Sequence, residues 1–221
     1  MRGHVRTRGG DERDERVPRE PMRLDQAAKP TEHLQAALKE AAPEGVPASF
    51  TALWDYWLSI REDAVCPSAA DFDPMKIARL LPDVSVFERR SRDEVVYRLA
   101  GTAIGERMGH DPTGENVLEL SDPERRSFLV DLFTEMTTRP VAAFVRYENI
   151  YASGRRATVQ SLLLPLALQS EETGNVAAPR VLSIHAMGPA KAYAPAQEKT
   201  TVGSTVEGAA WIDIGAGTPA A

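Results

Sequence analysis

The sequence predicts an α+β protein, in which an antiparallel sheet carries helices on one face and an additional helix at its N-terminal side. Two observations support this fold class. First, the elements expected within residues 47–190 come in the order helix, two strands, short helical turns, one longer helix and three strands. Second, strands and helices do not alternate regularly, as they do where a parallel sheet is built from strand–helix–strand units.

The first expected helix begins at Ser49, which is a good N-cap residue. Large apolar residues follow at the spacing of one helical face, and they are Phe50, Leu53, Trp54, Trp57 and Leu58. A second, short helix is expected from Asp73 and Pro74, because proline is favoured in the first turn of a helix.

Residues 84–88 and 94–100 are expected as two strands joined by a polar turn. Glycines then limit the chain to short helical turns, and they are Gly101, Gly105, Gly109 and Gly114. A capping box at residues 121–124 begins a longer helix, which is expected to end at Arg139.

A β-hairpin with long arms is expected over residues 141–151 and 157–168, with its turn at Ser153 and Gly154. In its first arm, alternation places Val141, Ala143, Val145, Tyr147 and Asn149 on one face and Phe144, Arg146, Glu148 and Ile150 on the other. Residues 180–187 are expected as the last strand, after a loop around residues 173–175.

Composition divides the chain into three parts. Residues 1–46 contain no aromatic residue of the Phe, Trp or Tyr type, so we expect a mostly disordered or weakly helical N-terminal extension; a start codon downstream of Met1 is another explanation of its Arg-rich opening. Residues 47–190 are long enough to bury a core. Residues 191–221 are rich in Ala, Gly and Thr around the apolar residues Trp211, Ile212 and Ile214, and we expect a flexible tail there.

The charge balance and the apolar segments exclude several functional classes. Lys and Arg number 26 and Asp and Glu number 32, which gives a formal charge of −6, whereas nucleic-acid binding needs a basic face. A membrane-spanning helix needs about 20 apolar residues, and no such stretch occurs. Nor does an apolar stretch follow the Arg-rich N-terminus, as it does in a secretory signal. We therefore expect a cytoplasmic protein that binds neither nucleic acid nor membranes.

Short motifs between Pro67 and Leu166 resemble, in the same order, those of one family. They are Asp71-Phe72-Asp73-Pro74, Leu80-Leu81-Pro82, Tyr97-Arg98-Leu99-Ala100-Gly101-Thr102, Thr113-Gly114 before Val117-Leu118-Glu119-Leu120, Arg139-Pro140, and Leu163-Leu164-Pro165-Leu166. The set resembles the short single-domain PAS proteins common in alphaproteobacteria. The resemblance implies the PAS fold, with a five-stranded antiparallel sheet in the order 2-1-5-4-3. It also implies a non-catalytic sensory or adaptor role in bacterial signalling.

The residues do not predict an enzyme or a metal site. The four histidines, His4, His33, His110 and His185, lack metal-ligand spacing, and serine-nucleophile and phosphate-loop motifs are missing. Haem-binding PAS proteins carry a histidine on the long helix and flavin photosensors a cysteine before it, and this sequence has neither. Haem and a cysteinyl-flavin adduct are therefore disfavoured, the cofactor stays unknown, and Cys66 is interpreted as a packing residue.

Several polar residues lie within otherwise apolar strands, and they are Asn149, Gln160, Ser161, Ser183 and His185. Polar groups inside a core must be hydrogen-bonded to protein, water or a ligand. Either these groups face solvent or satisfy one another, or some of them line a pocket beneath the long helix. The candidate ligand-binding residues are Tyr97, Arg98, Phe128, Phe133, Met136, Tyr147, Asn149 and His185. For Arg98, an ion pair beneath the first helix is the alternative.

The first helix presents more aromatic area than docking on one sheet needs. We therefore expect a homodimer, and the candidate interface residues are Phe50, Leu53, Trp54, Tyr56, Trp57 and Ile60. The alternative is a helix packed only on its own sheet in a monomer. Besides a second copy, a signalling protein and a small apolar or planar molecule are the expected partners. A dimerisation scaffold without a ligand is the alternative function.

Overall fold

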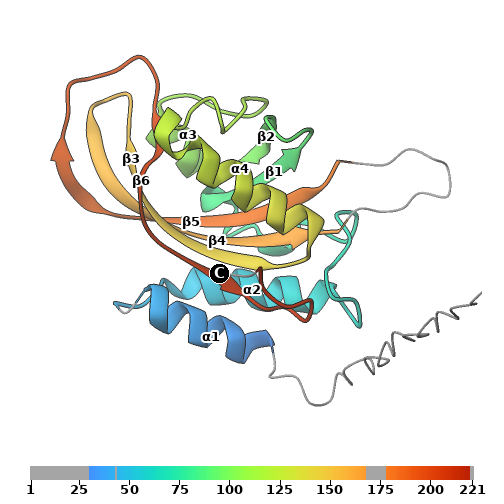
Figure 1. The fold of residues 1–221 in the computed structure, drawn as a ribbon. Helices are drawn as coiled ribbons and strands as arrows, with labels where there is room; N and C mark the ends of the chain where they lie inside the picture. The colour runs from blue at the N-terminus through green and yellow to red at the C-terminus, as the bar shows by residue number, and fades with distance from the viewer. Residues whose placement is uncertain (1–29, 43, 168–177, 220–221) are drawn as a thin grey trace, which may run out of the picture.

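The computed structural model describes residues 30–42, 44–167 and 178–219 (Figure 1). The predicted order from the first helix to the hairpin is confirmed, and an additional helix precedes it. The elements are α1 (Pro30–Ala41), α2 (Ala48–Ile60), η1 (Pro74–Ile77), η2 (Leu81–Asp83), β1 (Val84–Arg89), β2 (Val95–Ala100), α3 (Thr102–Met108), α4 (Pro123–Thr138), β3 (Ala142–Ile150), β4 (Arg155–Leu166), β5 (Arg180–Tyr193) and β6 (Thr201–Ile212).

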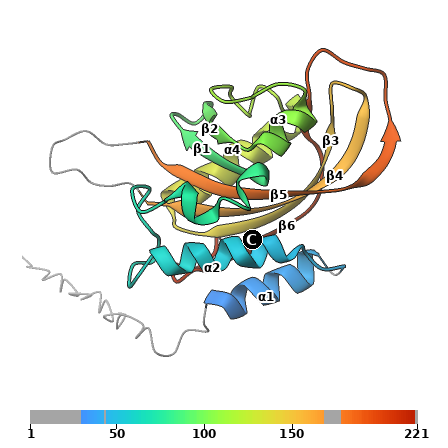
Figure 2. The same ribbon diagram turned by 180° about the vertical axis from the view of Figure 1, so that it is seen from behind.

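All neighbouring strands of the sheet are antiparallel, in the order β2-β1-β5-β4-β3-β6. The first five have the predicted order 2-1-5-4-3, and β6 is added beyond β3. Helices α3 and α4 lie on one face of the sheet, whereas α1 and α2 lie on the other (Figures 1 and 2). The sheet is therefore covered on both faces and not on one alone.

Strand alternation divides the interior into two cores, one on each side of the sheet. In β3, Ala142 and Phe144 pack with α1 and α2, whereas Ala143 and Val145 pack with α4. This separation agrees with the two faces predicted for the first arm of the hairpin. The core beneath α4 holds the candidate pocket, and the other core fixes α2.

The aromatic face of α2 is completely covered within one chain. Phe50, Leu53, Trp54 and Trp57 each have 0% exposure and pack on the sheet. Trp54 and Trp57 stack with ring centroids 5.7 Å apart, and Trp57 Nε1 donates to the carbonyl oxygen of Pro165 at 2.9 Å. These four residues are therefore core, which corrects the predicted dimer interface.

The other two candidate interface residues, Tyr56 and Ile60, are half-buried at the side of α2. The Tyr56 hydroxyl donates to the carbonyl oxygen of Asp73 at 3.1 Å and accepts from its backbone N–H at 2.8 Å. This pair of bonds joins α2 to the start of η1. Tyr56 thus has a role within one chain.

In place of the flexible tail predicted for residues 191–221, β5 continues to Tyr193 and Thr201–Ile212 forms β6. The register of β6 on β3 runs from Ala142 opposite Ile212 to Ile150 opposite Thr201. Ile212 is 0% exposed and Ile214 is 1% exposed. This part of the chain is thus integral to the sheet, which corrects the prediction.

Helix α1 packs on the face formed by β3 and β6. Leu34 is buried, and His33 Nδ1 lies 2.9 Å from the carbonyl oxygen of Asp213. The part of the predicted extension that the structure describes is therefore a docked helix; residues 1–29 lie outside the described residues, as does the loop at 173–175. None of the helices described is long and apolar enough to cross a membrane.

Candidate functional site

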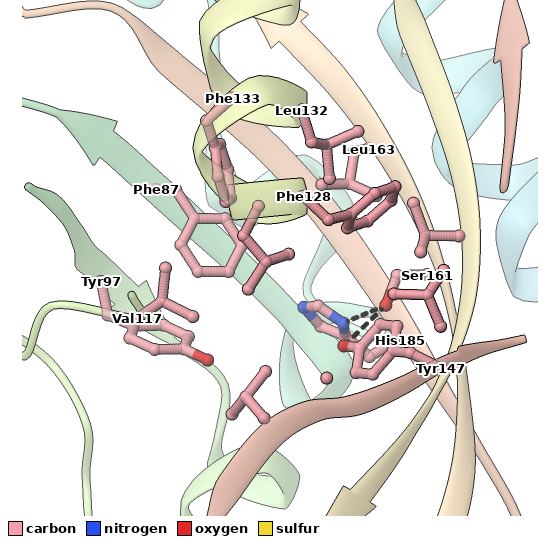
Figure 3. A pocket seen from close by; sticks show the side chains of 15 residues that line it. Phe87, Tyr97, Val117, Phe128, Leu132, Phe133, Tyr147, Ser161, Leu163 and His185 are labelled. Carbon is pink, nitrogen blue, oxygen red and sulfur yellow. Dashed lines mark hydrogen bonds between the residues drawn. The ribbon is translucent and has the colours of Figure 1, made fainter. Parts of the chain in front are cut away.

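A pocket lies between α4 and the face of the sheet beneath it (Figure 3). Its volume of about 40 Å³ exceeds the ~10–15 Å³ that one water molecule needs, so it has room for more than one water molecule. Most of its walls are apolar. The lining residues are Phe87, Tyr97, Val117, Phe128, Leu129, Leu132, Phe133, Val145, Tyr147, Ser161, Leu163, His185, Val202, Gly203 and Val206.

Aromatic contacts hold α4 against β1 and β2 at one side of the pocket. The Phe87 ring lies edge-on to Phe133 of α4, with centroids 5.2 Å apart, and its centroid is 4.7 Å from that of Tyr97. Phe128 lies one and a half turns before Phe133 on the same helix and is half-buried. These rings make an apolar wall that excludes water from the polar groups beneath it.

Three polar side chains on adjacent strands form a hydrogen-bonded chain at the floor of the pocket. Tyr147 lies on β3, Ser161 on β4 and His185 on β5, and the register places Ser161 directly opposite His185. The Ser161 Oγ atom is 3.1 Å from the Tyr147 hydroxyl and 2.7 Å from His185 Nδ1 (Figure 3). The polar residues therefore satisfy one another in part, as one of the two interpretations of the sequence expects.

The second nitrogen of the His185 ring, Nε2, is buried and has no hydrogen-bond partner among the described residues. It points away from Ser161 into the space between the labelled side chains (Figure 3). If Tyr147 donates to Ser161 and Ser161 donates to Nδ1, only the Nε2–H is left unpaired. The reverse direction leaves both Nε2 and a hydroxyl hydrogen unpaired, and each unpaired buried group costs about 1–3 kcal/mol. The Nε2–H tautomer is therefore favoured, and it presents a donor to the pocket.

Burial keeps this chain of side chains uncharged. The pKa of His185 is lowered to about 3, mainly because burial disfavours the charged imidazolium and secondly because Arg107 lies nearby. Burial also raises the pKa of Tyr147 to about 12, and it raises the pKa of Tyr97. The polar groups at the floor are thus neutral donors and acceptors around neutral pH.

A second hollow of about 30 Å³ adjoins the pocket beneath α3. Tyr97, Tyr147, His185 and Val202 line both spaces. The second hollow adds polar side chains that the first lacks, and they are Arg107, Asn149 and Tyr151. Helix α3 begins directly after Gly101, where a Cβ atom would lie 2.0 Å from the carbonyl oxygen of Leu81, so only glycine fits between β2 and η2.

The structure brings most of the predicted ligand-binding residues together. Tyr97, Phe128, Phe133, Tyr147 and His185 line the pocket, and Asn149 lines the adjoining hollow. There its side-chain oxygen accepts from the backbone N–H of Gly203 at 3.0 Å.

Two predicted residues lie elsewhere. Met136 is buried in the core beneath α4 but does not line the pocket. The Arg98 side chain is 57% exposed and lies 3.6 Å from Glu88. Arg98 is on the edge strand β2, whereas α2 covers the central strands β4 and β5, so α2 does not cover the Arg98 side chain. This corrects its assignment as a ligand anchor; an ion pair forms, but at the surface.

Some lining residues could not be found from the sequence. Val202, Gly203 and Val206 belong to β6, a segment whose composition predicts a flexible tail. Arg107 lies on α3, whose seven residues carry too few periodic positions to predict which side faces the sheet. Leu129 and Leu132 are exceptions, because the apolar residues of α4 recur at helical spacing and predict a face that contacts the sheet. These residues are Phe128, Leu129, Leu132, Phe133 and Met136.

Cys66 lies on the other side of the sheet, in the core that holds α2. Its Sγ donates to the carbonyl oxygen of Pro165 at 3.1 Å, and burial raises the pKa of the thiol to about 12. These contacts fit the packing role predicted for Cys66. Within the part of the chain that the structure describes, no group of three His, Cys, Asp or Glu residues could hold a metal ion.

A family model described as PAS domain matches residues 46–178, which is more than half of the chain. The chain therefore belongs to the PAS-domain family. PAS domains are sensory and interaction modules of signalling proteins. A search of the curated proteins found no match.

The depressed pKa of His185 predicts a loss of stability in mild acid. The unfolded state binds a proton near the ordinary pKa of about 6.5, whereas the folded state does so only near 3, so stability falls as pH falls between these values. From about pH 7.5 to about pH 5, His185 should contribute a loss of about 2 kcal/mol. Tyr97 and Tyr147, whose pKa values are raised by burial, stay neutral throughout this range.

Urea unfolding at the two pH values measures this loss, and the variant His185→Gln should lack it. His110→Gln is the matched control, because His110 is partly exposed in a loop, 3.0 Å from Glu115. An equal pH dependence in the wild-type chain and in His185→Gln would show that His185 is not buried as a neutral ring.

Proposed function

We propose that this PAS domain is a sensory module that binds a small, mostly apolar molecule in the pocket beneath α4. The observation that carries the proposal is the buried Nε2 of His185, which has no hydrogen-bond partner among the described residues and lies within apolar walls. Ligand sites commonly combine an apolar lining with a few convergent polar groups. A ligand oxygen at Nε2 would supply the missing acceptor and remove the cost of the unpaired donor.

The Ser161–His185 pair does not support hydrolytic chemistry. Ser161 is 1% exposed, and its hydroxyl already contacts both Tyr147 and His185 Nδ1. A serine nucleophile needs an accessible hydroxyl and a base that a third group orients. Here the second ring nitrogen faces the pocket, and no carboxylate among the described residues binds it. Binding is therefore a better account of these residues than catalysis.

The walls of the pocket suggest how binding reaches a signalling partner. Phe128 and Val206 line the pocket, are half-buried and belong to α4 and β6. A ligand between them changes the packing of two elements that also face solvent. A partner protein that contacts α4 or β6 would thereby distinguish the occupied pocket from the empty one.

Native mass spectrometry and an absorbance scan of the purified chain test the proposal. We expect a bound mass in the wild-type chain that is lost in Val206→Trp, since the indole fills the space between β6 and α4. Thr205→Trp is the matched control, because Thr205 is the exposed neighbour of Val206. The absence of a bound mass or chromophore from the wild-type chain would contradict the proposal and favour an interaction scaffold without a ligand.

A further inference from the structure

The pocket and the adjoining hollow share four lining residues and differ in chemistry, and we treat them as the two ends of one site. The apolar end lies beneath α4, between Phe87, Phe128, Leu132, Phe133 and Leu163. The polar end lies beneath α3 and is lined by Arg107, Asn149 and Tyr151. His185, with Tyr97 and Tyr147, lines both ends, so the His185 ring lies where the two ends adjoin.

The polar end offers hydrogen-bond donors near the positive charge of Arg107. The charge of Arg107 lowers the pKa values of His185, Tyr147 and Tyr151, although burial has the larger effect on each of them. Arg107 is held by an ion pair of 2.7 Å between Nη1 and Asp83, whose side chain is 44% exposed to water. Neither end is lined by an aspartate or glutamate among the described residues.

We propose that the site binds a small amphipathic anion, a short-chain carboxylate, with its hydrocarbon beneath α4 and its carboxylate between His185 Nε2–H and Arg107. This inference rests on the proposed function and specifies its ligand class. The apolar end supplies the driving force for the hydrocarbon. The polar end supplies the charged partner without which burial of a carboxylate is costly.

The alternatives fit the two ends less well. A cationic ligand would face Arg107, and the described lining residues include no carboxylate to bind it, since Asp83 pairs with Arg107 outside the lining. A neutral ketone would accept from Nε2–H but would gain little from the charge of Arg107. A charged group near a buried or half-buried partner interacts much more strongly than one in bulk water, so the anion should bind the tightest of the three.

Calorimetric titration of the full chain with hexanoate and with 2-heptanone tests this choice. The two probes have the same chain and the same carbonyl, but a methyl group in 2-heptanone replaces one carboxylate oxygen. We expect hexanoate to bind at least about tenfold more tightly than 2-heptanone. Arg107→Met should remove that advantage and leave the affinity for 2-heptanone within about twofold. Arg98→Met is the matched control, because Arg98 is exposed and does not line the site.

Circular dichroism and thermal unfolding of each variant show whether it is folded. Equal affinities for the two probes, or an Arg107→Met variant that still prefers hexanoate, would overturn the carboxylate assignment while the proposed function stands. If the purified chain carries another bound molecule and neither probe binds, the carboxylate assignment alone fails. If the chain carries no molecule and neither probe binds, both proposals fail.

Discussion

Replacement of Trp57 by alanine is expected to lower the free energy of unfolding by about 3–5 kcal/mol, which is the usual cost of removing a buried aromatic side chain. Trp57 is fully buried between α2 and the sheet, stacks on Trp54 and donates to Pro165. Loss of the Trp57 side chain leaves a large cavity between α2 and the sheet and removes one hydrogen bond. Urea unfolding followed by circular dichroism measures the change.

Trp54→Phe is the informative comparison. Trp54 Nε1 is buried and has no hydrogen-bond partner among the described residues, so phenylalanine removes an unpaired donor along with some packing. We expect this variant to lose much less stability than Trp57→Ala. Because both side chains are core within one chain, neither effect should depend on protein concentration. A concentration-dependent loss, or a Trp57→Ala variant as stable as the wild type, would contradict the packing of α2.

Removal of residues 199–221 is expected to destabilise the domain by about 5 kcal/mol or more. The truncation deletes β6 and the residues that follow it, and with them the buried apolar side chains of Val202, Ile212 and Ile214; each is worth about 1.5–3 kcal/mol. It also leaves the hydrogen-bonding edge of β3 unpaired and opens one wall of the pocket. Because whole domains are stable by only about 5–15 kcal/mol, the truncated chain should be marginally folded.

Removal of residues 216–221 is the control, since it keeps the three buried side chains of the C-terminal segment. Thermal unfolding of the two truncated chains should give a large loss for the first and a small one for the second. If the chain without residues 199–221 is as stable as the full chain, β6 is not integral to the sheet.

The elements of the PAS core could be predicted because their patterns are local. The apolar spacing of α2 and α4 and the alternation of β3 identify both the element and its buried side. Phe128, Phe133 and Tyr147 could therefore be placed near one another from the sequence alone. Their side chains are large and apolar, so their spacing along the chain indicates which side of each element is buried.

The sixth strand could not be predicted, because its stability comes from distant partners. Its residues include Gly203, Gly208, Ala209 and Ala210, and small residues give a weak strand signal. Pairing with β3 and the cover of α1 supply the missing stabilisation. Helix α1 in turn packs on β6, so two segments whose sequence patterns are weak stabilise each other.

The polar part of the site depends on register and on the path of helices across the sheet. That Ser161 lies opposite His185 follows from the pairing of β4 with β5, and a shift by one residue would turn these side chains to opposite faces. The exposure of Arg98 and the burial of Trp54 depend on which strands α2 crosses. Such long-range placement is not encoded in any short stretch of sequence.

The most direct test of the binding site is long-range ¹H–¹⁵N NMR of the His185 ring in the full chain near pH 6, with His185→Gln to assign its signals. We predict a neutral ring with its proton on Nε2, whose resonance shifts when hexanoate is added. A ring that is protonated at this pH, or that exchanges between both tautomers and does not respond to hexanoate, would contradict the site described between α4 and the sheet.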